Sequence, residues 1–513
     1  MFSSEQWLAN SGSNFYNGVA TTSLRFNSAS STILTKSFSA GDRKTCTFSF
    51  WLKRTIINTS QMIISGGAGN GDNDYWFHFE AGNVFTFRNT TGSAYTLVAK
   101  TTRVFRDTSA WYHFCLVIDT TEATAGNRIR LWVNGVLETL TISTNTTSQN
   151  DNTSVNYGGT HKIGVLSYSA QQYLNGYLAD VNVLDGIAIK DSDSDGYLDQ
   201  FGEQKGGVWI PKVYTGSYGT NGYRLEFKQT GDGSSTASSS TIGADTANSN
   251  HFKDANLDTY DSNMPDSPEL NWCTLNPLDN GGGGANTLSE GNLKAISSGN
   301  TWKHTRSTFT IPDGSWYCEF VATSGIGNGN TFFGIIPQHD ALPTSFIGST
   351  ATAWAYSSNS YWYNNNSAGG RGASGSGASW ATGIVIGLTF DGSTLKFYRE
   401  NSLEITIGSI PSAEYAIGVA LFASDAGVIN FGQDPTFAGV MDSSTSAKTP
   451  SNSGAGTADS EGNGKFFYAP PSGLALCTAN LPEPTIGPNS GTNEQSDDYF
   501  NTVLYTSDNI GAD

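Results

Sequence analysis

The sequence has few charged residues, few cysteines and no long apolar run. Only 14% of its 513 residues are charged, and acidic residues outnumber basic ones to give a formal net charge of −18. Binding to the phosphate backbone of DNA or RNA depends on clustered Lys and Arg, so we expect no nucleic acid partner. No apolar run reaches the roughly eighteen residues that could span a bilayer, and the N-terminus lacks a basic segment followed by an apolar one. We therefore expect no membrane insertion and no secretion signal.

The cysteines are odd in number and far apart in the sequence. Most of them lie inside apolar strand patterns, which predicts buried free thiols, and no two are close enough for a zinc-type CxxC pair. Assembly in a reducing cytoplasm fits this pattern. The five are Cys46, Cys115, Cys273, Cys318 and Cys477.

Glycine, small polar residues and aromatic residues make up much of the chain. There are 59 Gly, 12 Trp, 22 Tyr and 28 Phe. Aromatic and β-branched residues fit pleated surfaces, while Gly, Asn and Ser serve the turns between short strands. The composition predicts an all-β protein, and its length predicts more than one domain.

Strand patterns of the first half occur in a characteristic order. Residues 46–52 alternate with period two, so Cys46, Phe48, Phe50 and Leu52 share one face. Further strands are expected at 112–118, at 176–184 and at 223–227, and a hairpin at 129–137 turns at Asn134-Gly135. In this order the segments resemble the laminin G-like, concanavalin A-like jelly roll. That resemblance implies a β-sandwich over residues 21–230, after an N-terminal arm of residues 1–20.

Residues 231–285 are expected to be a linker and loop, because Gly, Ser, Thr and Ala dominate much of this stretch. A second set of strand patterns follows at 315–320, 332–336, 384–390, 395–398 and 428–437. The run Gly387 to Tyr398 and the Asn-Phe-Gly sequence at Asn430 resemble a SPRY domain. This resemblance implies a second β-sandwich over residues 286–438. The fold class we predict is all-β: two concanavalin-like antiparallel sandwiches in series with a small C-terminal β segment.

Residues 439–513 are predicted to form a C-terminal connector and tail. The apolar stretch from Phe466 to Cys477 is expected to pack back on the second sandwich. The strand pattern at 498–505 has no later segment to pair with, so it should join an existing sheet edge or meet another chain.

The densest cluster of like charge is the run from Asp191 to Asp199. Carboxylates at alternate positions followed by Gly196 can curl around one hard cation, so Asp191, Asp193, Asp195 and Asp199 are a candidate structural Ca²⁺ site. The alternative is a solvated acidic turn, because position twelve of the loop is Gly202 and the acid falls at Glu203. No candidate base lies near the run, so we expect a role in stability.

No catalytic constellation is recognisable. The six histidines are scattered, and His113, which lies between aromatic neighbours in a strand pattern, is expected to be structural. A glycosidase of concanavalin-like fold would need paired carboxylates, and Glu400 and Glu404 flank an expected hairpin turn, where a solvated pair is the ordinary interpretation. We predict a non-enzymatic protein, with glycan hydrolysis as an alternative.

A group of aromatic residues beside three asparagines is a candidate glycan-binding patch, because sugar rings stack on aromatic faces. The alternative is that most of them are strand residues that pack inward or lie at a subunit contact. The residues are Trp354, Tyr356, Tyr361, Trp362 and Tyr363.

Two late segments, residues 476–484 and 500–505, extend a further resemblance over nearly the whole chain. Together with the two sandwiches they resemble virion proteins of tailed bacteriophages, especially marine ones. The resemblance implies a virion component assembled in the bacterial cytoplasm, either a fibre or receptor-binding subunit that adheres to host glycan, or a capsid or tail decoration protein. It also implies other virion proteins and the chain itself as partners, as a homotrimer by analogy with fibres.

Overall fold

A computed structural model describes residues 15–190, 197–205, 207–324, 329–371, 379–441, 448 and 455–481. These residues are strands, turns and loops with one 3₁₀ turn, η1 (Ala125–Asn127), and no α-helix, which confirms the all-β prediction. No helix among them is long and apolar enough to cross a membrane. The chain divides into a compact unit of residues 1–480 and a short unit of residues 481–513, and the fold below is that of the first.

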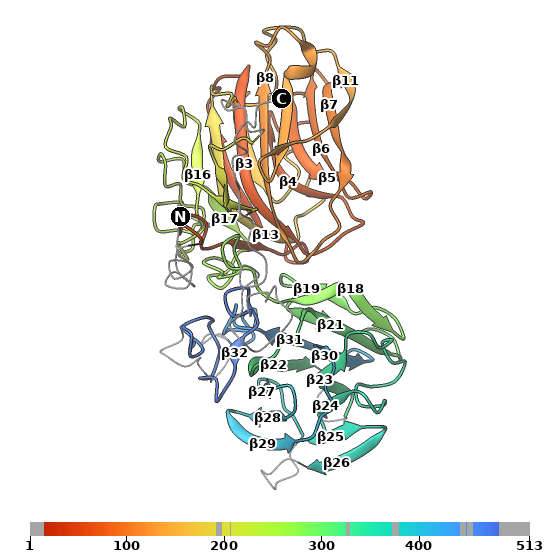
Figure 1. Ribbon diagram of the computed structural model, residues 1–513. Coiled ribbons are helices and arrows are strands. Elements are labelled where there is room, and N and C mark those ends of the chain that lie inside the picture. The colour runs from red at the N-terminus through yellow and green to blue at the C-terminus, as the bar shows by residue number, and fades with distance from the viewer. Residues whose placement is uncertain are drawn as a thin grey trace, which may run out of the picture. The chain divides into compact units, whose positions relative to one another are not determined.

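The first sandwich consists of a seven-stranded and an eight-stranded sheet, drawn from red to yellow-green in Figure 1. The seven-stranded sheet has the order β1 (Leu24–Phe26), β13 (Gly176–Asp185), β3 (Thr45–Arg54), β8 (Trp111–Asp119), β9 (Ile129–Val133) and β10 (Val136–Leu137), with β16 (Tyr223–Leu225) also paired to β13. The eight-stranded sheet has the order β11 (Leu140–Asn145), β7 (Ala94–Val104), β6 (Val84–Thr91), β5 (Asp74–Phe79), β4 (Gln61–Gly67), β12 (Gly159–Ile163), β2 (Ile33–Phe38) and β17 (Lys253–Ala255). A separate ribbon pairs β14 (Gly202–Lys205) with β15 (Val208–Pro211).

The alternation in β3 sets which side chains fill this sandwich. Cys46, Phe48, Phe50 and Leu52 all lie in the main apolar core, as the period-two pattern predicted. The hairpin between β9 and β10 is also confirmed: Asn134 and Gly135 both have positive φ, 50° and 77°, as a tight two-residue turn requires. All five cysteines are buried free thiols.

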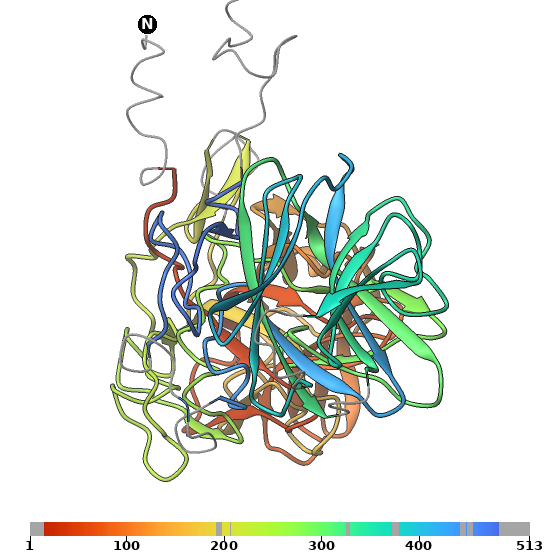
Figure 2. The same ribbon diagram turned by 90° about the horizontal axis from the view of Figure 1, so that it is seen from below.

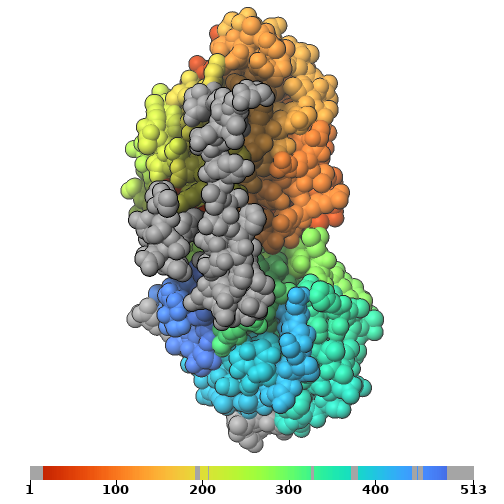
Figure 3. All heavy atoms as spheres, viewed as in Figure 1, coloured from red at the N-terminus to blue at the C-terminus, as the bar shows by residue number. Residues whose placement is uncertain are grey.

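The second sandwich also has a seven-stranded and an eight-stranded sheet, seen from below in Figure 2. One sheet has the order β18 (Leu275–Gly282), β21 (Trp302–Thr310), β30 (Tyr415–Phe422), β23 (Thr331–Pro337), β24 (Trp354–Ser357), β25 (Tyr361–Asn364) and β26 (Ser367–Arg371). The other has the order β19 (Thr287–Ser289), β20 (Lys294–Ile296), β31 (Ala426–Asn430), β22 (Trp316–Ser324), β27 (Val385–Phe390), β28 (Leu395–Arg399) and β29 (Ser402–Ile407), with β32 (Leu474–Ala475) parallel to β22. Side chains fill the space between the ribbons, as the space-filling view shows (Figure 3).

The segment 231–285, expected to be a linker and loop, contributes strands to both sandwiches. β17 extends the eight-stranded sheet of the first sandwich by pairing with β2, and β18 pairs with β21 of the second. Its polar composition hid these short strands, because neither shows an apolar period. The domain boundaries themselves stay a prediction.

The stretch from Phe466 to Cys477 packs on the second sandwich as expected. Phe466 and Cys477 lie in one apolar cluster with Tyr317 of β22. The buried carboxylate of Glu319 accepts hydrogen bonds from the backbone N–H groups of Phe467, at 2.7 Å, and Tyr468, at 2.9 Å. The strand pattern at 498–505 lies outside the described residues.

Polar groups cross between the two sandwiches within residues 1–480. The Tyr177 hydroxyl on β13 donates to the Gly291 carbonyl at 3.0 Å, and the Asn292 amide donates to the Thr55 carbonyl at 2.9 Å. All four of these groups lie in buried surroundings. Since a buried polar group is costly unless it is hydrogen-bonded, these contacts fix how the two sandwiches meet.

Candidate functional site

Two of the five aromatic residues proposed for glycan binding are core residues. Trp354 is 7% exposed and Tyr356 is 0% exposed. Tyr356 packs between the rings of Trp380 and Phe397, with centroids at 5.2 and 5.3 Å. These two rings therefore pack inward, as the alternative interpretation of the segment has it, because β24 is an inner strand of its sheet and its side chains face packed layers.

The other three aromatic residues lie on β25 but not on one face. Trp362 is opposite Tyr356 and Tyr363 is opposite Ala355, so the two side chains point to opposite sides of the sheet. Tyr363 packs on Phe332, with centroids 5.3 Å apart. Trp362 lies so close over Gly369 of β26 that a Cβ there would be 1.8 Å from the indole. The structure thus does not bring Trp354, Tyr356, Tyr361, Trp362 and Tyr363 into one patch.

The acidic run falls mostly outside the described residues. Asp191, Asp193 and Asp195 lie there, while Asp199 is described and has an oxygen 3.6 Å from Lys212 Nζ. Among the described residues, no group of three or more His, Cys, Asp or Glu side chains could hold a metal ion. The Ca²⁺ site stays a prediction.

His113 is the satisfied structural histidine that its strand position suggested. Trp209 donates to its Nδ1 at 3.1 Å, so Nε2 carries the proton and faces Ser49 Oγ at 2.8 Å. Burial lowers the pKa of His113 to about 3. The ring therefore stays neutral and serves packing and hydrogen bonding.

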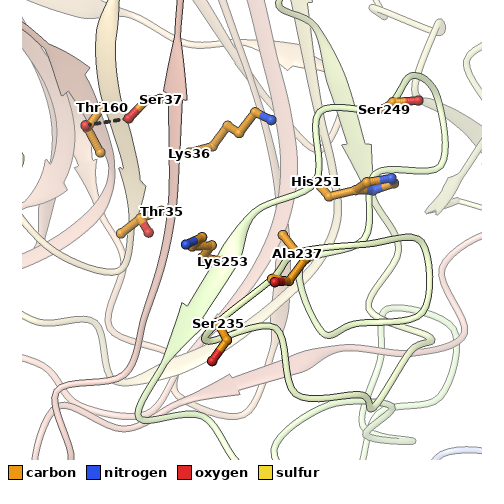
Figure 4. Close-up of a pocket in the computed structure, with 10 residues that line it drawn as sticks. Thr35, Lys36, Ser37, Thr160, Ser235, Ala237, Ser249, His251 and Lys253 are labelled. Carbon is orange, nitrogen blue, oxygen red and sulfur yellow. Dashed lines mark hydrogen bonds between the residues drawn. The ribbon is translucent and has the colours of Figure 1, made fainter.

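A groove of about 620 Å³ opens at one edge of the first sandwich, where no sequence pattern predicted a site (Figure 4). Its volume is in the range of about 300–1,000 Å³ that is typical of small-molecule sites. Hydroxyl and cationic side chains dominate its lining. The lining residues are Thr35, Lys36, Ser37, Thr160, Ser235, Thr236, Ala237, Ser249, His251 and Lys253.

The groove exists because β17 covers only part of the edge of β2. β17 pairs with Ile33 to Thr35, and the chain before it, carrying Ser249 and His251, takes a separate path. Along β2, Leu34 and Phe38 enter the core, so Thr35 and Ser37 lie on the opposite face. Lys36 lies on the core side at this edge, with its ammonium 5.9 Å from the ring of Phe38. Its side chain reaches toward the segment with Ser249 and His251 (Figure 4).

The far wall of the groove is the polar segment before β17, and its own hydrogen bonds hold it in shape. Gly231 N–H donates to the Ser240 carbonyl at 3.2 Å, and Ile242 N–H donates to the Gly231 carbonyl at 2.9 Å. The buried carboxylate of Asp254 accepts from Gly233 N–H at 2.7 Å. Because these hydrogen bonds hold the segment in place, the wall of the groove is formed before a ligand binds, which lowers the entropy cost of binding.

The groove offers donors and positive charge. Neither Lys36 nor Lys253 has a carboxylate within ion-pair distance among the described residues. His251 Nδ1 accepts from Asp245 N–H at 3.0 Å, so in the neutral ring Nε2 carries the proton. The hydroxyls of Ser37 and Thr160 lie 3.0 Å apart on paired strands. No Asp or Glu is among the ten lining residues.

Sequence reasoning missed this site because its parts are spread over more than two hundred residues. Each part is an ordinary polar residue without a motif, and only the pairing of β2 with β12 and β17 brings them together. The small, polar composition of residues 231–250 predicted a linker and loop rather than the wall of a groove.

Comparison with known proteins finds a family model that matches part of the chain. Residues 26–192 match the laminin G type of the concanavalin A-like lectin/glucanases superfamily. This match confirms the concanavalin-like fold predicted from the order of the strand patterns, and that fold fits a carbohydrate-binding or adhesion role. Among curated proteins, no sequence match was found.

Several solved structures are similar to part of the chain. The SPRY domain of human HERC1 is 16% identical, with 31% of this chain and 97% of that chain covered at a TM-score of 0.26. Another human SPRY domain is 12% identical, with coverage of 27% and 90% and a TM-score of 0.23. A heptameric SAP-like pentraxin from Limulus polyphemus is 14% identical, with coverage of 32% and 74% and a TM-score of 0.24.

Proposed function

We propose that the protein is a non-enzymatic adhesion subunit of a bacteriophage virion, part of a fibre or receptor-binding assembly, and that it binds host glycan. The observation that carries the binding role is the preformed groove at the edge of β2, with six hydroxyl side chains and three basic ones on a concanavalin A-like sandwich. Saccharides are recognised by convergent donors and acceptors that fix their hydroxyl groups. The virion setting is supported by the resemblance of residues 476–484 and 500–505 to phage proteins.

Binding without hydrolysis is supported by the chemistry of the lining. Glycoside hydrolysis needs two carboxyl groups on opposite sides of the scissile bond. The groove lining has none, and Glu400 accepts hydrogen bonds from Val385 N–H, Lys448 and Tyr468 instead. We assign no catalytic residue.

The proposed setting is a virion assembled in the bacterial cytoplasm, with other virion proteins and further copies of this chain as partners. A homotrimer is proposed by analogy with fibres. A decoration protein of the capsid or tail is the second candidate, and the buried polar contacts between the sandwiches favour it, because a rigid joint suits a structural subunit.

The test is binding of the purified chain to a panel of immobilised bacterial surface polysaccharides. Ala237→Trp places an indole in the groove, and Ala94→Trp places one at an exposed position on β7. We expect wild type and Ala94→Trp to bind the same polysaccharide and Ala237→Trp to lose binding with an unchanged melting temperature. Equal binding by all three variants would rule out the groove as the glycan site, and release of reducing ends would establish hydrolysis instead.

A further inference from the structure

The groove concentrates positive charge in a strongly acidic protein. The chain has 27 Lys and Arg against 45 Asp and Glu, yet Lys36 and Lys253 line one space without an acidic neighbour in the lining. Lys53, by contrast, is buried in an ion pair with Asp266 at 2.8 Å. An ammonium group without a carboxylate partner is available to a ligand.

The two acids that flank the segment from His251 to Lys253 are engaged elsewhere. The carboxylate of Asp245, which precedes His251, accepts four backbone N–H groups, those of Arg224, Ala247, Asn248 and Asn250, at 2.8 to 3.2 Å. Asp254 follows Lys253 but is 3% exposed, and its Oδ2 accepts from Gly233 N–H. Neither of these acids lines the groove, so neither neutralises its charge from within.

We infer that the groove selects an anionic saccharide, one that carries carboxylate or sulfate groups, over a neutral one. Lys36 of β2 and Lys253 of β17 line the groove from opposite faces of the sheet edge, because Lys253 pairs with Thr35 rather than with Lys36. Each ammonium group can hold an anionic group of the saccharide by charge-assisted hydrogen bonds, which are about twice as strong as neutral ones. His251 Nε2–H and the hydroxyls of Thr35 and Ser249 bind the ring hydroxyls. This inference rests on the proposed glycan binding and adds the class of glycan.

The surrounding charge makes the selection testable. With a net charge of −18, the rest of the surface repels a polyanion, and at physiological salt this repulsion is screened beyond about 8 Å. Retention of a polyanion therefore requires a local cationic site, and raising the salt to about 1 M should abolish it.

The experiment compares dextran sulfate and polygalacturonate with neutral dextran by titration calorimetry against the full chain. The variants are Lys36→Met and Lys253→Met, which keep most of the apolar stem, and their double variant. Lys228→Met is the matched control, because this substitution removes the same charge from a residue outside the groove lining. Lys228 pairs with Glu226 at 2.7 Å. We expect wild type and Lys228→Met to bind at least one polyanion and not dextran, and each groove variant to bind it about tenfold more weakly.

Two outcomes overturn the inference, and they differ in what they say of the proposed function. If dextran binds as tightly as the polyanions and Ala237→Trp abolishes that binding, the groove binds glycan without selecting for charge. The inference is then wrong, and the proposed glycan binding stands. Polyanion binding that is equal in wild type and the double variant, or binding of none of the three polymers, removes the inference. In that case the polysaccharide panel decides separately whether the protein binds glycan at all.

Discussion

Arg25 on β1 of the first sandwich donates from Nη1 to Asp434 Oδ2 of the second at 3.1 Å, and the side chains are 0% and 2% exposed. Its Nε donates to Asp261 at 3.0 Å. Burial by itself would lower the pKa of Arg25, but Asp261, Asp434 and Glu290 outweigh it and raise that pKa. Arg25 therefore stays charged in the interior. The contact between the two sandwiches, here called the joint, depends on its ion pair with Asp434.

Replacing Arg25 with Met should loosen this joint. The variant leaves buried carboxylates without their cation, and breaking a buried pair in this way costs about 3–5 kcal/mol. We expect a lower urea midpoint, with the two sandwiches unfolding in separate transitions that intrinsic fluorescence and circular dichroism would resolve.

The matched control is Lys190→Met. Lys190 is 57% exposed and lies 2.9 Å from Glu122, and an exposed pair of this kind contributes about 0–1 kcal/mol. An Arg25→Met protein that unfolds at the wild-type midpoint in a single transition would show that the ion pair does not hold the joint.

Asp425 should make stability depend on pH. Burial raises the pKa of Asp425 to about 6, although Thr331 donates a 2.9 Å hydrogen bond to its Oδ2. The folded state then holds this proton at pH values where the unfolded chain has released it, so the stabilising effect is complete below the ordinary pKa of 3.8 and is lost as the pH rises through about 6.

Asp425→Asn keeps an acceptor for Thr331 and cannot ionise. We expect the unfolding free energy of this variant, relative to wild type, to increase between pH 4 and about pH 7, as measured by urea titration at each pH. A difference that stays constant over that range would show that Asp425 has no raised pKa in the fold.

The strand patterns predicted much of the fold, because a buried face leaves a local signature. The alternation of Cys46, Phe48, Phe50 and Leu52 and the positive φ of Asn134 and Gly135 are properties of short segments. The burial of Tyr356 is different, since it depends on β23 and β25 covering both edges of β24 and on the layer beneath it. The groove depends on strand pairing between segments distant in sequence, which no local pattern in one chain encodes.

The buried and the half-exposed tryptophan of the aromatic segment should behave differently. Trp354→Ala removes a ring that packs against Tyr415, and emptying such a site costs about 3–5 kcal/mol. Trp362→Ala removes a half-exposed ring and should cost roughly 1–2 kcal/mol. Chemical denaturation measures both.

Glycan binding distinguishes the two candidate sites further. We expect Trp362→Ala to bind polysaccharide as wild type does, because the groove lies in the other sandwich. Loss of binding in Trp362→Ala, with binding retained in Ala237→Trp, would move the site to β25.

The acidic run can be tested by removing Ca²⁺. A ligand that binds only the folded state at 100 times its dissociation constant stabilises it by about 2.7 kcal/mol, so chelation should lower the melting temperature by a few degrees. The double variant Asp193→Asn/Asp195→Asn should melt at the temperature of the wild type in chelator, and adding chelator should not change its melting temperature. A wild-type melting curve that is the same with and without chelator would argue for a solvated turn.

The most direct test of the account is to locate bound polysaccharide on the full chain by hydrogen exchange. With a saturating polysaccharide chosen from the binding panel, we predict slower exchange in residues 35–37 of β2 and in residues 235–251 of the groove wall, and little change in β25 and β26. Protection confined to β25 and β26, or protection unchanged by Ala237→Trp, would contradict the assignment of the groove as the glycan site.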